Sequence, residues 1–319
     1  MLRSLFLYLS KANWARKLVM GFSIARRTAL RFVAGESMQN AIEAVRVLNQ
    51  DGLWATLDHL GEDIESAQQA QQSTEEIIAI LNAIHAAGVQ SNVSIKLTQI
   101  GLNLDAELCA ENLERILQRA RELDNFVRID MEDSPVIDVT LELYRRMRAK
   151  GYDNVGKVLQ SYLYRTKEDA EALLAEGTRI RLVKGAYDEP PEVAFPLKAD
   201  ADACFDEITT LLLEAATDES APAASPNGHW PPLPGIATHD VKRIEHTKRI
   251  AQQLALPRNK YEFQMLYGIR RDLQERLKDE GYLMRVYVPY GTEWYPYFMR
   301  RLAERPANVW FFLSNFLRW

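Results

Sequence analysis

Eight strand-like segments alternate with helix-like segments along this 319-residue chain, and this order constrains the fold more than any other feature. Each strand-like segment is short and apolar, and each is followed by the apolar spacing of an amphipathic helix. We place strands at 53–58, 93–97, 127–131, 156–160, 180–183, 235–238, 261–265 and 284–288. Helices follow near 73–87, 106–122, 137–150, 167–176, 199–216, 240–255, 270–280 and 296–304. The series predicts an α/β protein, a (β/α)₈ TIM-like barrel.

An open, doubly wound sheet is the alternative arrangement for such a series. That fold commonly binds dinucleotides through a G-x-G-x-x-G turn after its first strand. No two glycines of this chain stand at G-x-G spacing, so the barrel is favoured.

Two segments stand apart from the alternation. Residues 1–49 predict an N-terminal helical arm, and residues 50–319 the barrel domain. Within the arm, residues 1–35 carry seven basic and no acidic side chains, which suits either packing on the barrel or contact with an anionic membrane surface. Residues 217–234 are rich in Pro, Ser and Ala, and this composition predicts a mobile, disordered-type insertion at the barrel's amino-terminal face.

The composition is that of an ordinary globular protein, with 47% hydrophobic residues, 26% charged residues and a net charge of -5. A negative net charge gives no reason to expect nucleic acid as a partner. The two cysteines and five histidines form no metal-binding pattern, so we predict no metal site. No apolar run is long enough for a membrane-spanning helix. We expect a cytoplasmic protein, with residues 1–35 as the candidate for peripheral contact with the inner face of a membrane.

Polar residues collect where the predicted strands end. In a barrel, the carboxyl ends of the strands form the binding face. Lys96 stands out because burying an unpaired ammonium costs several kcal/mol, so it needs a carboxylate or an anionic ligand. Asp130 and Glu132, two apart at the next strand's end, are both candidates for that partner. The full set at these ends is Asp58, Lys96, Asp130, Glu132, Gln160, Arg181, Thr238, His239, Gln264 and Tyr287.

The last predicted helix carries a second polar group. Tyr297, Arg300, Arg301 and Glu304 fall at i, i+3, i+4 and i+7, which places them along one face. Two adjacent guanidinium forks suit a small carboxylate ligand. A solvated face with an Arg300–Glu304 ion pair is the alternative reading of the same spacing.

This C-terminal stretch closely resembles the signature of the proline dehydrogenase family, flavoenzymes that oxidise L-proline. The family pattern is Arg-x-Tyr at a strand end and then Tyr-x-x-Arg-Arg-x-x-Glu, which here reads Arg285-Val286-Tyr287 and Tyr297 to Glu304. The resemblance spans roughly residues 35 to 308. It implies FAD-dependent oxidation of L-proline to Δ1-pyrroline-5-carboxylate, the first step of proline catabolism, with electrons passed to a quinone. A separate pyrroline-5-carboxylate dehydrogenase would then act downstream.

The resemblance also implies a role for individual residues at matching positions. Asp130 and Arg181 resemble the catalytic pair. The implied proline-binding residues are Lys96, Tyr287, Tyr297, Arg300 and Arg301, and the implied FAD contacts are Met131, Gln160, Lys184, Gly185, Ala186, Thr238 and His239. Glu62 resembles a lid residue that pairs with an arginine of the last helix when substrate is bound.

Two other classes of function fit the residues taken alone. A strand-end lysine in an apolar pocket is the usual arrangement of a Schiff-base aldolase or lyase, with Lys96 as the nucleophile. A small-molecule binding module without catalytic activity is the third class. Neither of these two classes calls for a bound flavin.

Overall fold

Eight parallel strands close into a barrel in the chain order β1 to β8, with β1 paired to β8. The computed structural model describes residue 9, residue 12, residues 14–15, residues 31–61 and residues 64–304. The strands are β1 (Trp54–His59), β2 (Ser91–Ile95), β3 (Val127–Ile129), β4 (Val155–Gln160), β5 (Ile180–Val183), β6 (Pro234–Ala237), β7 (Glu262–Leu266) and β8 (Met284–Tyr290). The predicted (β/α)₈ barrel is confirmed.

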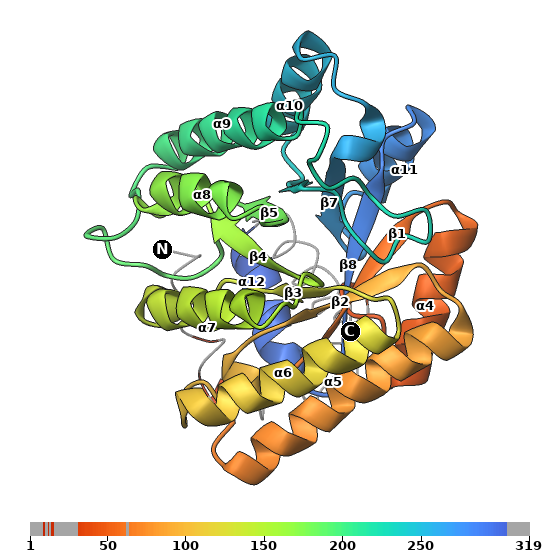
Figure 1. Ribbon diagram of the computed structural model, residues 1–319, viewed down its shortest axis with the longest axis vertical. Helices are drawn as coiled ribbons and strands as arrows, with labels where there is room; N and C mark the ends of the chain where they lie inside the picture. Colours follow the sequence, from red (N-terminus) through yellow and green to blue (C-terminus); the bar gives the residue numbers. More distant parts are fainter. Residues whose placement is uncertain (1–8, 10–11, 13, 16–30, 62–63, 305–319) are drawn as a thin grey trace, which may run out of the picture.

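Helices surround this barrel, and α12 lies across one of its ends (Figure 1). The helices are α4 (Met38–Gln50), α5 (Ala67–Ala87), α6 (Ala106–Glu122), α7 (Ile137–Ala149), α8 (Thr166–Ala175), α9 (Lys198–Ala215), α10 (Val241–Gln253), α11 (Arg271–Asp279) and α12 (Trp294–Glu304). Short 3₁₀ helices add η1 (Thr98–Ile100), η2 (Ser134–Val136) and η3 (Arg258–Lys260). The largest difference from the predicted bounds is at α5, which begins six residues before the predicted residue 73. Ser66 caps it there by accepting a hydrogen bond from the Gln69 N–H, and its first turns are polar, so the apolar pattern missed them.

The strands alternate between an apolar outer face and a polar inner face. Outward-facing residues such as Leu57, Ile95 and Phe263 are fully buried against the helices and form the main hydrophobic core. In the inward-facing rows, Asp58 is paired in register with Ser94, and Ser94 with Arg128. The hydrophobic core therefore lies between sheet and helices, and the barrel interior is a layer of polar side chains.

The segment 217–234, predicted as a mobile insertion, packs under the amino ends of the strands. The Asn92 side chain donates a hydrogen bond to the carbonyl of His229 at 3.0 Å. Trp230 lies 5.9 Å from the ring of Phe126, and the guanidinium of Arg179 lies 5.1 Å from the Trp230 ring centre. These contacts make the segment the floor of the barrel.

The two ends of the chain are described only in part. Most of the basic arm, residues 1–35, and the tail from residue 305 lie outside the described residues. Of the arm, Ala15, Phe32 and Val33 are buried in a second hydrophobic cluster with α12. No helix in the described part of the chain combines the length and the apolar character needed to cross a membrane.

Lys157 is a charged residue on the otherwise largely apolar outer face of the strands. Lys157 is paired in register with Ile129 and Ile180, is fully buried, and its Nζ has no hydrogen-bond partner among the described residues. Burial lowers the pKa of Lys157 to about 7, although the charges of Asp130 and Glu132 act in the opposite direction. Between that value and the ordinary lysine pKa, the unfolded chain binds the extra proton, so the free energy of unfolding rises with pH across this window.

We therefore expect Lys157→Met to be more stable than the parent by more than about 1 kcal/mol near pH 6.5, with the gap narrowing toward about pH 10. Urea unfolding at several pH values measures this difference. Lys167→Met, on the exposed face of α8, is the control and should change stability by less than about 1 kcal/mol. A gap that does not vary with pH would show that the buried amine is not the titrating group.

Candidate active site

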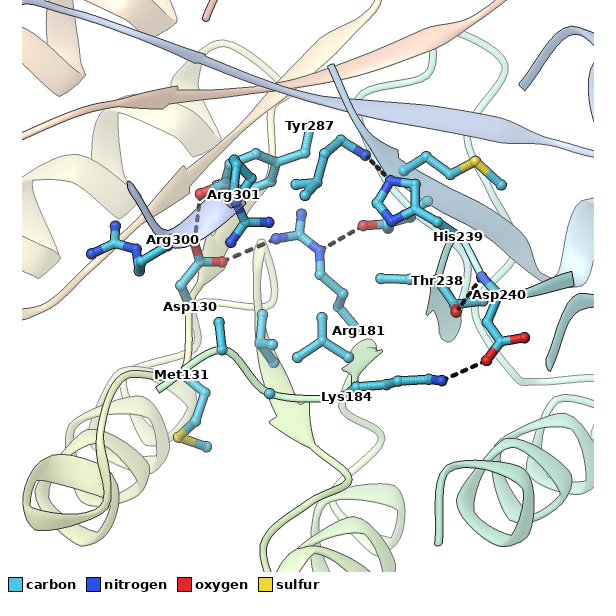
Figure 2. Close-up of a pocket in the computed structure, with 18 of the residues that line it drawn as sticks. Asp130, Met131, Arg181, Lys184, Thr238, His239, Asp240, Tyr287, Arg300 and Arg301 are labelled. Carbon is cyan, nitrogen blue, oxygen red and sulfur yellow. Dashed lines mark hydrogen bonds and ion pairs between the residues drawn. The ribbon is translucent and has the colours of Figure 1, made fainter. Parts of the chain in front are cut away.

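A cavity of about 820 Å³ opens at the carboxyl ends of the strands, the face where barrels bind their ligands. All but one of the predicted site residues line it: Lys96, Asp130, Met131, Arg181, Lys184, Gly185, Ala186, Thr238, His239, Tyr287, Tyr297, Arg300 and Arg301. In Figure 2, Tyr287, Arg300 and Arg301 gather on the side near Asp130, and Lys184, Thr238 and Asp240 lie on the other side. The cavity thus has two chemically different halves.

Asp130, directly after β3, is the centre of the first half. Its Oδ1 accepts hydrogen bonds from Ser94 Oγ at 2.9 Å and from Arg181 Nη1 at 3.0 Å. Its Oδ2 accepts from the Tyr287 hydroxyl at 2.8 Å and lies 3.8 Å from Lys96 Nζ. One carboxylate therefore ties together side chains that come from β2, β5 and β8.

Lys96 finds a further partner that the sequence analysis did not assign. Its Nζ lies 3.3 and 3.2 Å from the two carboxylate oxygens of Asp58, which is fully buried at the end of β1. Glu132, the other predicted candidate, accepts a hydrogen bond from the Thr98 N–H at 3.1 Å. The sequence analysis placed Asp58 among the polar residues at the strand ends. Its pairing with Lys96 depends on the register of β1 against β2, which the sequence does not give.

Tyr287 stays protonated in this setting. Burial raises its pKa well above the usual range, and the neighbouring charges of Asp130 and Asp58 raise it further. The guanidinium of Arg181 lies 5.3 Å from its ring centre. Tyr287 is thus a neutral hydrogen-bond donor that packs between charged groups.

The last helix supplies two arginines to the same half. The apolar side of α12, with Tyr295, Phe298 and Leu302, packs into the second hydrophobic cluster, which also contains Leu60. The opposite side directs Tyr297, Arg300 and Arg301 to the cavity, as their spacing predicted. Glu304 ends the helix, and its side chain lies outside what the structure describes.

The second half of the cavity is lined by both lysine and aspartate side chains. Lys184 Nζ is held between Asp202 at 2.5 Å and Asp240 at 2.7 Å. Burial acts to raise the pKa of Asp240, but the hydrogen bond and charge of Lys184, together with the Lys242 N–H and the charge of Lys198, outweigh it and hold the pKa below its usual range. Gly185 has a φ of +121°, and a Cβ there would lie 2.2 Å from the Tyr162 ring, so only glycine fits this turn.

His239 is oriented by the backbone of the next strand. Its Nε2 accepts a hydrogen bond from the Leu266 N–H at 3.0 Å, which leaves the proton of the neutral ring on Nδ1. Thr238, beside it, accepts a hydrogen bond from the Asp240 N–H at 3.1 Å. Both residues lie where the sequence analysis placed them, on the cavity wall after β6.

Gln160 is the predicted contact that does not line the cavity. It is buried behind the wall, and its Nε2 donates to the carbonyls of Met131 at 3.0 Å and Glu132 at 2.9 Å. It supports the turn that carries Met131. Glu62, the predicted lid residue, lies outside the described residues.

Comparisons with known proteins show the family of this chain. A sequence profile of the family described as Proline dehydrogenase matches residues 41–313. This chain belongs to the proline dehydrogenase family. It is 43% identical to proline dehydrogenase 2 of Bacillus subtilis (strain 168), over 97% of this chain and 96% of that protein. It is 42% identical to the proline dehydrogenase of Deinococcus radiodurans, over 91% of this chain and 90% of that one.

A solved structure of the family shares the fold. Proline utilization A (PutA) from Bdellovibrio bacteriovorus, inactivated by N-propargylglycine, superposes with a TM-score of 0.78 at 25% identity. The alignment covers 88% of this chain and 33% of that longer protein, so this chain spans about a third of its length. Membership of the proline dehydrogenase family makes the chain an oxidoreductase, as the sequence resemblance predicted.

The surroundings of Lys96 also disfavour the Schiff-base alternative. A nucleophilic lysine must give up its proton, and nearby carboxylates favour the charged form. Lys96 lies within 4 Å of both Asp58 and Asp130, at 3.2 and 3.8 Å. In this family member Lys96 is therefore the ion-pair partner of two carboxylates.

The buried pair Lys96–Asp58 gives a testable consequence. Removing one partner of a buried ion pair leaves an uncompensated charge, whereas removing both is often close to neutral. We expect Asp58→Asn to lower the free energy of unfolding by about 3 kcal/mol, and Asp58→Asn with Lys96→Met to recover most of that loss. Urea unfolding measures both.

An exposed ion pair provides the matched control. Arg115 and Glu75 are about half exposed, so Arg115→Met should cost less than about 1 kcal/mol. If Asp58→Asn costs no more than this control, the Asp58 carboxylate does not compensate the buried charge of Lys96.

Proposed function

We propose that this protein oxidises L-proline to Δ1-pyrroline-5-carboxylate, the first step of proline catabolism, with FAD as its cofactor and a quinone as the final electron acceptor. The observation that carries the proposal is the meeting of Arg300 and Arg301 with Asp130, Lys96 and Arg181 around one cavity. That cavity offers two arginines that suit a carboxylate and, farther along, a second group of lysine side chains.

The residues present fit FAD. The wall beside Arg181 is apolar, with Met131, Val158 and Ala237, and suits a flat ring system. The far half carries Lys184, Lys198 and Lys242, whose ammonium groups suit phosphates, next to the carboxylates of Asp202 and Asp240. The turn at Gly185 and Ala186 presents backbone to the cavity between these two regions. When bound, FAD would supply the two-electron acceptor for a hydride from proline C5.

At the other end, the chain's own residues bind and orient proline. Arg300 and Arg301 can grip the carboxylate with paired hydrogen bonds, which fixes the ring relative to the cofactor. Tyr287 and Tyr297 form walls of this pocket, and Lys96 lies beside Asp130 at its base. Arg181 provides a positive charge where negative charge builds up on reduction.

The electron acceptor and the next step are proposed from the family resemblance. A quinone acceptor would bring the enzyme to the inner face of a membrane, and residues 1–35 are the proposed contact. The product would pass to a separate pyrroline-5-carboxylate dehydrogenase.

The visible absorption spectrum of the purified protein tests this function directly. An oxidised flavin gives bands near about 380 and 450 nm, and we expect these to bleach on anaerobic addition of L-proline but not of D-proline. A yellow protein that ignores L-proline would contradict the substrate. A protein that stays colourless after reconstitution with FAD would contradict the cofactor.

The carboxylate-binding role of the two arginines is tested separately. Lysine keeps the charge but cannot reproduce the planar fork, so Arg300→Lys and Arg301→Lys should each raise the KM for proline by about tenfold or more. Steady-state kinetics measures this, with Arg276→Lys on the outer surface of α11 as the control. Wild-type KM values in both variants would show that these arginines do not hold the carboxylate.

A further inference from the structure

A chain of buried hydrogen bonds runs through the barrel interior, from the active site to the floor. Arg181 Nε donates to Gln264 Oε1 at 2.6 Å, and Gln264 Nε2 donates in turn to Glu262 Oε1. Glu262 accepts from Arg285 Nε at 2.9 and 3.1 Å. Arg285 Nη1 then donates to the carbonyls of Ala55 at 2.8 Å and Gly228 at 2.9 Å.

The amide of Gln264 matches both of its neighbours in this series of hydrogen bonds. It accepts from a cation on one side and donates to an anion on the other, which sets the orientation of its oxygen and nitrogen. A carboxylate there would face Glu262, and an ammonium would face Arg181. Gln264 is 3% exposed, so water cannot replace either bond freely.

The surroundings hold Gln264 in this position. Glu262 and Arg285 form an ion pair with side-chain exposures of 0% and 1%, anchored to the backbone of β1 and of the floor segment. Gly235, on the neighbouring strand β6, leaves room for the amide, because a Cβ there would lie 2.6 Å from Gln264 Nε2.

Hydrogen bonds hold the Arg181 guanidinium at two of its nitrogens, Nη1 and Nε. Its Nη1 donates to Ser94 Oγ at 2.9 Å and to Asp130 Oδ1 at 3.0 Å, and its Nε donates to Gln264. The ring of Tyr287 covers one face of the guanidinium. Figure 2 shows this guanidinium at the middle of the pocket, between Asp130 and His239.

We propose that Gln264 is a positioning residue that orients Arg181 toward the cofactor, and that the Glu262–Arg285 pair beneath it holds Gln264 in place. The inference rests on the proposed flavin chemistry for its effect on catalysis. A planar guanidinium held only at its Nη1 edge could rotate about that edge, and a donor outside its productive geometry loses most of its effect.

Two variants test the role of the Gln264 amide in different ways. Gln264→Leu removes both hydrogen bonds, and Gly235→Ala leaves every bonding group in place but crowds Gln264. Gly235 has no positive φ, so alanine is compatible with its backbone. Asn154→Leu is the control, because Asn154 is a fully buried amide that donates to Leu117 and Asn125 carbonyls and does not contact Arg181.

The first measurement needs neither cofactor nor substrate. The Nε–H signal of Arg181 in ¹H–¹⁵N spectra of arginine-labelled protein is assigned by its loss in Arg181→Lys. We expect this proton to exchange with solvent at least about tenfold faster in Gln264→Leu and Gly235→Ala, because its acceptor is lost or displaced, and to be unchanged in Asn154→Leu.

The second measurement is made on the holoenzyme. We expect kcat to fall by about tenfold or more in both variants, with the KM for proline within about twofold, because Arg300 and Arg301 are untouched. The reduced form of the cofactor should also be less favoured, which appears as a lower midpoint potential. Asn154→Leu should lower the melting temperature without these changes.

The outcomes separate the two proposals. A wild-type protein without flavin or proline activity refutes the proposed function, and the Nε–H exchange still tests the positioning of Arg181. An active wild-type enzyme whose Gln264→Leu and Gly235→Ala variants keep the wild-type exchange rate, kcat and potential refutes the positioning role. If Gln264→Leu does not fold, Gly235→Ala decides the question by the same criteria.

Discussion

The carboxylate of Asp130 is the interaction on which the site depends, because it connects strands that are not neighbours in the sheet. Asp130 follows β3, and it accepts hydrogen bonds from Arg181 on β5 and Tyr287 on β8. Only a closed barrel brings these strand ends face to face across its interior. The site is therefore a consequence of closure, and it cannot form on a partly paired sheet.

Two hydrophobic clusters leave the barrel interior free for polar chemistry. The main cluster lies between the strands and the outer helices, where Leu57, Ile95 and Phe263 are buried. The second packs α12 against Ala15, Phe32 and Val33 of the N-terminal arm. The ring centres of Phe32 and Phe298 are 6.2 Å apart. Because apolar burial elsewhere supplies the stability, charged groups such as Glu262 and Arg285 can be buried together inside.

The cavity joins two binding chemistries at the position of Arg181. In the proposed function, the α12 arginines and Tyr287 on one side bind a small amino acid carboxylate, and Lys184 and its neighbours on the other bind phosphates. In the function proposed above, a small substrate and a large cofactor meet beside Arg181 of β5. The polar interior below Arg181 gives this meeting point a rigid support that reaches the floor segment near Gly228.

The sequence by itself determined the fold and most of the residues around the cavity. Strand alternation and helix spacing are local properties, so they predicted the eight strands, the surrounding helices and the cavity-facing side of α12. The sequence did not determine which residues meet in space. It assigned neither Asp58 to Lys96 nor Gln264 to Arg181. It also did not show that Gln160 lies behind the cavity wall or that residues 217–234 pack under the strands. Those pairings depend on strand register and barrel closure, which bring together distant residues such as Ala55 and Arg285, 230 positions apart. Only the tertiary structure sets these distances, because local periodicity carries no information about which strand ends will face each other.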